Sequence, residues 1–294
     1  METERCRILL HVIEEGSLTA AAEKLGYTIS GISRMMGALE KEAGFPLLVR
    51  SRGGVSPTAE CRALLPVMRE LVQTAERFDQ AAGEFCGMSR GTITIGTSYY
   101  AYYRWFARLI ADFHKLYPNI TIHMIEGTST ELLQAMQEQR ADMCIISRRP
   151  GAGEWIPLTR DPMLACLPEN HPMADASSFP LEAFAEEDFI ELYPGKETDN
   201  SLMFAAAGVR PKVRYSSSDN YAVYAMVAAG LGIASTNSII AESFTEGVRY
   251  LPVSPPQYVE IGIAVPERER QSPAARRFAA FAAEEARRSR LDEA

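Results

Sequence analysis

The sequence lacks the residue clusters that mark metal sites and most enzyme active sites. Its five cysteines (Cys6, Cys61, Cys86, Cys144 and Cys166) are odd in number and widely spaced, with no C-x-x-C pair. No G-x-S-x-G, H-E-x-x-H or G-x-G-x-x-G motif follows an expected strand, and GTITIGT at 91–97 lacks the lysine of a P-loop. We therefore expect no catalytic residue, no metal and no cofactor, and we expect reduced thiols, as in a cytoplasmic protein.

An export signal and a membrane span are also missing from the sequence. The start METERCRILL is acidic where a secretory signal peptide would be basic. Residues 221–240 carry no charge, but Gly230 and Gly232 divide them and the second half is polar. A helix followed by a short buried strand explains this stretch better than a membrane helix does. We therefore expect no contact with a membrane.

The chain as a whole has no excess of positive charge, since its net charge is −8. That value argues against nonspecific coating of nucleic acid. The charge is unevenly distributed, because residues 1–57 carry seven basic and seven acidic side chains while the remainder supplies the whole excess. The N-terminal part therefore has a different electrostatic role from the rest.

Three short helices are predicted within the first 43 residues. Apolar spacing predicts one over 3–15, ended by Gly16, and a second after Ser17, ended by Gly26. Thr28 can cap a third, whose outward stripe Ser30, Arg34, Gly37 and Lys41 is small, polar and positive. Such a face suits the major groove of DNA, which is about 12 Å wide.

A basic hairpin is predicted directly after these helices. The segment FPLLVRSRGGVSP reads as a strand, a glycine turn and a returning strand, with Arg50 and Arg52 at its tip. Together the elements predict a winged helix-turn-helix over 1–57. The DNA-binding residues that we expect are Thr28, Ser30, Ser33, Arg34, Arg50 and Arg52, with the wing arginines on phosphates. The alternative is a small helical packing module without a ligand.

A long helix is predicted over 58–90. Apolar residues from Cys61 to Phe85 alternate spacings of three and four, which is the pattern of a coiled-coil seam, although Pro66 should kink it. The expected dimerisation residues are Leu64, Met68, Leu71 and Phe78. The alternative is an amphipathic helix docked on the core of its own chain.

Strands and helices alternate over 91–294, which predicts an α/β domain of two lobes with a parallel sheet. Lobe one is expected over about 91–162 and 265–294, and lobe two over about 163–264, with a separate strand at MLACLP (163–168). The fold class is therefore α/β with an N-terminal all-α winged helix-turn-helix.

The stretch from Glu14 to Thr58 (EEGSLTAAAEKLGYTISGISRMMGALEKEAGFPLLVRSRGGVSPT), with AAGLGIAS later in the chain, resembles the LysR-type transcriptional regulators. The resemblance covers essentially the whole chain. It implies a regulator that binds an inverted repeat of double-stranded DNA near a promoter and self-associates as a dimer or tetramer. It further implies an effector domain resembling periplasmic solute-binding proteins, a small-molecule effector in the cleft between the lobes, and RNA polymerase as a candidate partner.

The effector site is expected where strands of an open α/β sheet end and helices begin. Thr97 and Ser98 follow the first strand, and Thr128 to Glu131 form a capping box that also places Ser129 at a helix start. The full expected set is Thr97, Ser98, Thr128, Ser129, Ser147, Tyr193, Lys196, Thr198 and Asn220. Capping alone would also explain Thr128 and Glu131. Lys196 and Arg148 favour an anionic effector, whereas Glu126, Asp219 and the tyrosines at 99–103 favour an amine or an aromatic compound.

Two other functions fit parts of the sequence. A solute-binding protein or a small-molecule enzyme could use the same α/β scaffold, because a fold does not fix a function. The helix-turn-helix pattern and the absence of a signal peptide argue against a solute-binding protein, and turnover assays with a bound metabolite would separate the enzyme.

Overall fold

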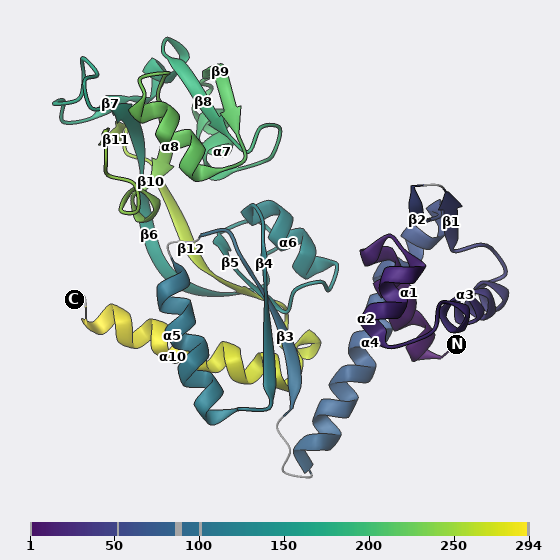
Figure 1. The fold of residues 1–294 in the computed structure, drawn as a ribbon. Coiled ribbons are helices and arrows are strands. Elements are labelled where there is room, and N and C mark those ends of the chain that lie inside the picture. Colours follow the sequence, from purple (N-terminus) through teal and green to yellow (C-terminus); the bar gives the residue numbers. More distant parts are fainter. Residues whose placement is uncertain (1, 52, 86–89, 100–101, 293–294) are drawn as a thin grey trace. The chain divides into compact units, whose positions relative to one another are not determined.

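The computed structural model describes residues 2–51, 53–85, 90–99 and 102–292. The chain divides into two compact units, one made mainly of residues 1–91 and the other mainly of residues 92–294. Each unit has its own hydrophobic core (Figure 1).

The first unit contains three short helices, a hairpin and a long helix. These are α1 (Thr3–Glu15), α2 (Leu18–Leu25), α3 (Ile29–Ala43), β1 (Leu48–Ser51), β2 (Gly54–Pro57) and α4 (Ala59–Phe85). Both predicted caps are confirmed, because Ser17 Oγ accepts a hydrogen bond from Ala20 N at 3.3 Å and Thr28 Oγ1 accepts one from Gly31 N at 3.0 Å. Each satisfies a backbone N–H that the first helical turn leaves unpaired.

The core of this unit comes from one face of each helix. Ile8, Leu9 and Val12 of α1 meet Ile32 and other apolar residues of α3, and all of these side chains are almost fully buried. Burying each such side chain stabilises the unit by about 1.5–3 kcal/mol. The helix-turn-helix therefore holds its shape through a small apolar core.

The hairpin is fixed to the helices by backbone contacts. Glu40 Oε1 accepts hydrogen bonds from Leu47 N at 2.8 Å and Leu48 N at 3.1 Å, which ties the start of β1 to α3. Val55 N donates to Gly16 O at 2.7 Å. Gly54 is required at this approach, because its φ is +118° and a Cβ there would lie 2.5 Å from Gly16 O. The wing is thus held at a defined position beside α3.

Helix α4 packs on its own unit over its first half. Cys61, Leu65, Met68 and Val72 are buried in the same core as α1–α3. Pro66 does not break the helix, since α4 runs without interruption through this residue. Met68 is only 4% exposed in a single chain, so its side chain packs within its own unit. The apolar pattern on this part of α4 is explained by packing within the chain.

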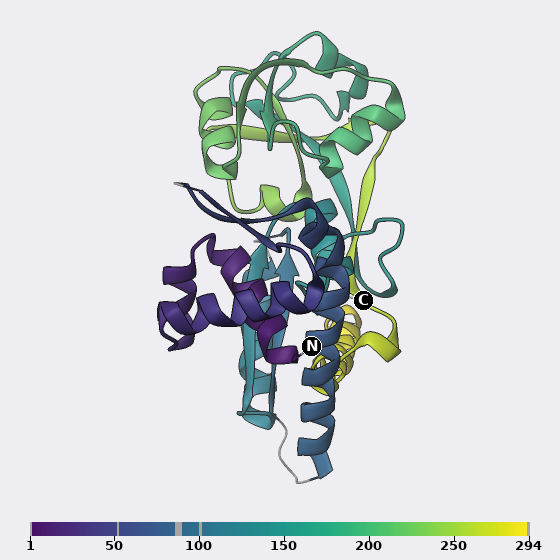
Figure 2. The same cartoon turned by 90° about the vertical axis from the view of Figure 1, so that its right-hand side faces the viewer.

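The second unit has two α/β lobes (Figures 1 and 2). In lobe one, β3 (Gly91–Thr97), β4 (Ile120–Glu126) and β5 (Met143–Ser147) carry the helices α5 (Tyr103–Leu116), α6 (Ser129–Gln137) and α10 (Pro273–Asp292). Strand β3 runs parallel to β5. Phe113 of α5 packs edge-to-face on Phe278 of α10, with ring centroids 4.9 Å apart.

Lobe two surrounds a second apolar core. Its strands are β7 (Phe179–Pro180), β8 (Asp188–Leu192), β9 (Lys212–Ser217), β10 (Ala234–Asn237) and β11 (Val248–Ser254), with helices α7 (Asp199–Ala207), α8 (Asn220–Ala228) and α9 (Ser238–Ala241). Four phenylalanines, among them Phe184 and Phe204 with centroids 5.0 Å apart, form the centre of that core.

Two strands, β6 (Glu154–Pro168) and β12 (Tyr258–Val265), connect the lobes. In Figures 1 and 2 they are the long ribbons between the two lobes. The first part of β6 pairs with β12 and its second part pairs with β10 and β11. The strand expected at 163–168 is confirmed, but it is the second half of a 15-residue strand whose first half, from Glu154, was not predicted. Prolines at 157 and 162, normally found at strand edges or bulges, hide this continuity in the sequence.

No helix in the described part of the chain is long and apolar enough to cross a membrane.

Candidate functional site

The exposed side of α3 carries the residues expected to contact DNA. Thr28, Ser30 and Arg34 are exposed and Ser33 is half-buried, while Ile32, Met36 and Leu39 face the core. Within the described residues, Arg34 makes no ion pair, so its guanidinium is available to a phosphate or a base. The outward stripe therefore has the slender, hydrogen-bonding character that the sequence predicts.

The wing brings one further arginine to this surface. Arg50 is exposed on β1, and its Nη2 donates a hydrogen bond to Ser33 Oγ at 3.3 Å. Arg52, the second wing arginine predicted from the sequence, lies outside the described residues. Tyr27 and Ile29, at the start of α3, are 43% and 50% exposed and add apolar surface that the prediction did not include.

Three of the predicted effector residues meet where the strands of lobe one end. Ser129 Oγ, at the start of α6, lies 2.9 Å from Ser98 Oγ and 2.9 Å from Ser147 Oγ, and it accepts a hydrogen bond from Ser147 N at 3.1 Å. Thr97 and Thr128 lie beside them with structural contacts of their own. Thr97 Oγ1 bonds to the backbone of Tyr99, and Thr128 forms the expected capping box with Glu131.

A loop of lobe two, residues 193–198, contacts α6 of lobe one. Lys196 Nζ lies 2.9 Å from Glu131 Oε1, and Thr130 Oγ1 donates to Glu197 Oε1 at 2.8 Å. Tyr193 has a φ of 57°, a left-handed conformation that is rare for an aromatic residue. Thr198 caps α7, so its hydroxyl is engaged with Ser201 N at 3.2 Å. Lys196 is thus paired with a carboxylate, and Thr198 is engaged in helix capping.

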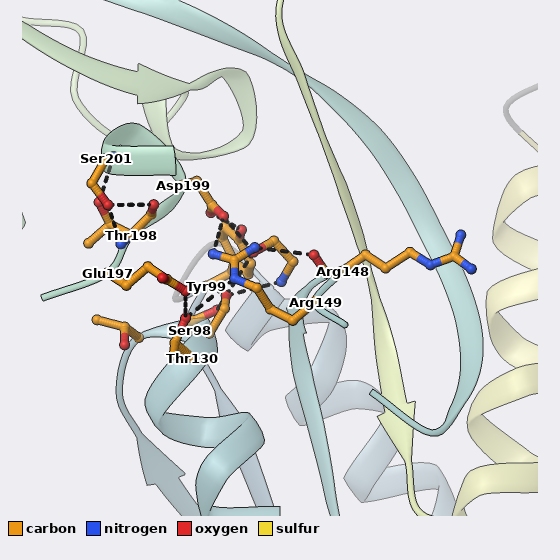
Figure 3. Close-up of polar contacts among 12 residues, drawn as sticks. Ser98, Tyr99, Thr130, Arg148, Arg149, Glu197, Thr198, Asp199 and Ser201 are labelled. Atoms are coloured by element: carbon orange, nitrogen blue, oxygen red, sulfur yellow. Dashed lines mark hydrogen bonds and ion pairs between the residues drawn. The ribbon is translucent and has the colours of Figure 1, made fainter. Parts of the chain in front are cut away.

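A buried ion pair between the lobes involves two residues that sequence reasoning missed, Arg149 and Asp199. Asp199, the first residue of α7, accepts a hydrogen bond from Arg149 Nη2 at 2.8 Å, one from Ser147 Oγ and one from Tyr99 Oη (Figure 3). The side chain of Arg149 is 8% exposed and that of Asp199 is 18% exposed. An ion pair this buried needs further hydrogen bonds to offset its desolvation, and Ser147 and Tyr99 supply them.

Arg149, and not Arg148, is the arginine of the cleft. Arg148 pairs with Glu260 at 3.1 Å and is 61% exposed, and Figure 3 shows it directed away from Arg149. The expectation that Arg148 favours an anionic effector stays a prediction, and Arg149 is the arginine that contacts Asp199. Arg148 and Arg149 are adjacent residues after the end of β5, and their side chains have partners on opposite sides. The sequence did not reveal which of the two faces Asp199.

Burial and charge shift several pKa values in this region. Burial, reinforced by the neighbouring Asp199 carboxylate, raises the pKa of Tyr99 well above its usual value, so the phenol remains a donor. The Thr128 backbone N–H and the Lys196 ammonium lower the pKa of Glu131. Burial, followed by the Glu126 carboxylate, raises the pKa of Tyr103.

A cavity of about 70 Å³ lies between the lobes beside Asp199. Six of the nine predicted effector residues line it, namely Ser98, Thr128, Ser129, Tyr193, Thr198 and Asn220. Thr97 lines a neighbouring open pocket of about 390 Å³, and Ser147 lines another of about 850 Å³. Three polar atoms at the cavity, Asn220 Oδ1, Ser235 Oγ and Asn237 Nδ2, are buried without a hydrogen-bond partner. Such atoms normally find a partner in protein, water or a ligand.

Among the described residues, no group of three or more His, Cys, Asp or Glu side chains could hold a metal ion. Cys6, Cys61, Cys144 and Cys166 are free thiols. Cys86 lies outside the described residues.

Comparison with known proteins agrees with this architecture over both units. Residues 3–62 match the model of the bacterial regulatory helix-turn-helix protein, lysR family, and residues 87–287 match the LysR substrate binding domain. The uncharacterised transcriptional regulator YvbU of Bacillus subtilis is 28% identical over 97% of this chain and 98% of its own length. The regulator cbl of Escherichia coli is 28% identical over 75% of this chain and 72% of its own length.

Solved structures show the same fold. A full-length OxyR from Pseudomonas aeruginosa has a TM-score of 0.74 at 20% identity, with 98% of this chain and 95% of that one covered. CbnR in complex with its target DNA has a TM-score of 0.63 at 19% identity, covering 97% of this chain and all of that one. A solute-binding protein or an enzyme on the same scaffold is not favoured, because the helix-turn-helix match is part of the same chain. The chain belongs to the LysR family of bacterial transcriptional regulators, with an N-terminal helix-turn-helix and a two-lobed substrate-binding domain.

Proposed function

We propose that this regulator reads an inverted repeat near a promoter through α3 and the wing, and that a small-molecule effector bound between the two lobes changes how it sits on that DNA. The observation that carries the DNA part is the exposed stripe of α3, with Arg34 lacking an ion pair in the described chain and Arg50 hydrogen-bonded to Ser33. A helix inserted in the major groove reads base edges, while flanking arginines bind phosphate. The other DNA residues of the proposal are Thr28, Ser30 and Arg52.

The effector part rests on the cavity between the lobes. Its lining is polar, it adjoins the helix start at Ser129, and it contains the unpartnered atoms of Asn220 and Ser235. The lobes are joined through β6 and β12 and by side-chain contacts, so a ligand that favours one arrangement shifts the population toward it. The role proposed is binding and not catalysis, because the charged side chains of the cleft are held in ion pairs, Arg149 with Asp199 and Lys196 with Glu131.

The proposal includes pairing of two subunits through α4. Phe78 is 72% exposed and Val67 is 60% exposed on this helix, which is a surface that a second copy could cover. Leu64 and Leu71 are half-buried against the core of the first unit and belong to the same proposed surface.

The test is selection from genomic DNA. Purified full-length protein is mixed with sheared DNA from its source at moderate salt, and bound fragments are recovered and sequenced. Arg34→Ala serves as the matched variant. We expect the wild type to enrich a few intergenic sites that share an inverted repeat, and Arg34→Ala to enrich them less. Flat recovery with the wild type, also in the presence of candidate metabolites, would contradict the proposal.

A further inference from the structure

The Asp199 carboxylate is not needed by the helix that carries it. An aspartate in the first turn of a helix commonly bonds to that helix's own N–H groups. Here Thr198 and Ser201 already form a complete capping box, with Thr198 N donating to Ser201 Oγ at 2.8 Å and Ser201 N donating to Thr198 Oγ1 at 3.2 Å. The Asp199 side chain is therefore free to reach across to lobe one.

In lobe one the carboxylate enters a set of converging donors. Arg149 and Ser147 bond to Oδ1, and Tyr99 bonds to Oδ2 (Figure 3). Tyr99 is 2% exposed, Ser147 is 1% exposed, and the Arg149 side chain is 8% exposed. A guanidinium and two hydroxyls that meet both oxygens of one carboxylate form a recognition site for that group.

These donors belong to the ligand cleft and not to the packing of lobe one. Arg149 also donates to Ser147 Oγ at 2.6 Å, and through Ser147 and Ser129 the network reaches the start of α6. A buried guanidinium needs an anion beside it, because an unpaired charge in a low dielectric is costly. The subsite must therefore hold an anionic group from either Asp199 or a ligand, and the two cannot occupy it together.

The cavity beside this subsite has space for the remainder of a ligand that displaces Asp199. It holds about 70 Å³ of space, which is room for a few water molecules or a compact organic group. The unpartnered Ser235 Oγ belongs to a residue that is 4% exposed, and Asn220 Oδ1 is likewise unpartnered. A ligand hydroxyl or N–H beside these two atoms would satisfy them.

We propose that Asp199 is an internal ligand of this subsite, and that the effector is a small carboxylate that displaces Asp199 from Arg149, Ser147 and Tyr99. The inference rests on the proposed function, since it names the chemical class of the effector. Displacement removes the ion pair between the lobes, so ligand binding is coupled directly to the contact that joins them.

The experiment removes the internal carboxylate and supplies another from solution. Full-length Asp199→Ala has a vacant subsite, and its thermal unfolding is followed in increasing acetate and in sodium chloride of equal ionic strength. We expect acetate to raise the Tm of Asp199→Ala by about 3 °C relative to chloride, as binding to the native state alone requires. The Tm of the wild type, whose subsite is filled by Asp199, should rise by less than a third of that. The same limit applies to the Tm of Arg149→Met/Asp199→Ala, which lacks the cation.

Two further ligands and one replacement variant make the result decisive. Acetamide, an uncharged molecule of the same size, should have no effect, and inorganic phosphate should stabilise Asp199→Ala less than acetate does. Equal stabilisation by phosphate would overturn the carboxylate class, and no stabilisation of folded Asp199→Ala by acetate would overturn the subsite. If the alanine variant does not fold, Asp199→Ser carries the same expectations.

The acetate readout involves no DNA. A negative acetate result would leave the regulator assignment intact if genomic selection still enriches discrete sites. Flat selection together with acetate rescue would leave the subsite intact and contradict the proposed DNA function.

Discussion

Arg50 Nη2 lies 3.3 Å from Ser33 Oγ, so a guanidinium of the wing strand is joined to a hydroxyl of α3. Glu40 strengthens this arrangement by accepting the backbone N–H groups of Leu47 and Leu48 at the base of the wing. The wing arginine and the exposed stripe of α3 therefore form one surface whose geometry is set before DNA binds.

The first prediction concerns Arg50. Arg50→Ala is expected to weaken binding to every duplex and to reduce the slope of log affinity against log salt by about one, because one phosphate contact is lost. The measurement is fluorescence anisotropy over a salt series. Arg249→Ala, which removes a surface arginine paired with Glu169 in lobe two, is the control and should leave the slope unchanged. An unaltered slope in Arg50→Ala would show that Arg50 does not contact the DNA backbone.

Arg34 is expected to act differently, because it lies on the stripe of α3 that faces the groove. Arg34→Ala should reduce discrimination between the selected site and a shuffled duplex by about 1–3 kcal/mol, as loss of one base contact does. Competition binding with the two duplexes at one salt concentration measures this difference. Equal loss of affinity for both duplexes would place Arg34 on phosphate and not on a base.

Thr28 caps α3, and it is also one of the residues proposed to contact DNA. Thr28→Ala should lower the stability of the first unit by about 1 kcal/mol, since Oγ1 is the acceptor for Gly31 N. Thr28→Ser keeps that acceptor and is the matched control. Chemical unfolding and DNA affinity are measured for both variants. If Thr28→Ser is as stable as the wild type yet binds DNA poorly, the methyl group contacts DNA and capping is only part of its role.

Local chemistry made much of the fold predictable from the sequence. The caps at Ser17 and Thr28 and the capping box at Thr128 are short-range hydrogen bonds whose partners lie three residues away. The continuity of β6 was not predictable in this way. Its second half was predicted, but its first half is a strand because it pairs with β12, which lies about 100 residues further along the chain.

The site was predicted where its residues stand at strand ends or helix starts. Ser98 and Ser147 stand at strand ends and Ser129 begins α6, and the structure brings their hydroxyls together. The Arg149 and Asp199 pair was missed because its partners are 50 positions apart in the chain and belong to different lobes. Nothing local distinguishes Arg149 from Arg148, or shows that the cap at Thr198 leaves Asp199 free.

Helix α4 offers a prediction on assembly. Phe78→Glu is expected to lower the mass measured by light scattering, because a charge on this exposed ring would oppose burial against a second subunit. Met68→Ala is the contrasting variant. Met68 is buried in its own chain, so its truncation should cost about 2–5 kcal/mol of stability without changing the mass. An unchanged mass for Phe78→Glu would contradict pairing through this part of α4.

The buried thiols give a prediction on pH. Burial raises the pKa of Cys144 and of Cys166 to about 12, and both side chains are fully inaccessible. Iodoacetamide at pH 8 should therefore leave Cys144 and Cys166 unmodified in the native protein and label them in urea, as mass spectrometry of peptides would show. Rapid native labelling of either would contradict this burial.

The same shift links stability to pH. An unfolded thiol ionises near pH 8.5, whereas native Cys144 keeps its proton up to about pH 12, so the native state binds more protons between these values. The contribution of this thiol to the free energy of unfolding is therefore fully retained below pH 8.5. It falls by about 1.4 kcal/mol per pH unit as the pH rises above that value. Urea unfolding of wild type and Cys144→Ala at pH 8 to 10.5 isolates this contribution, because the other titrating groups are common to both. The stability advantage of the wild type should shrink with rising pH, and a constant difference would show that the Cys144 thiol ionises equally in both states.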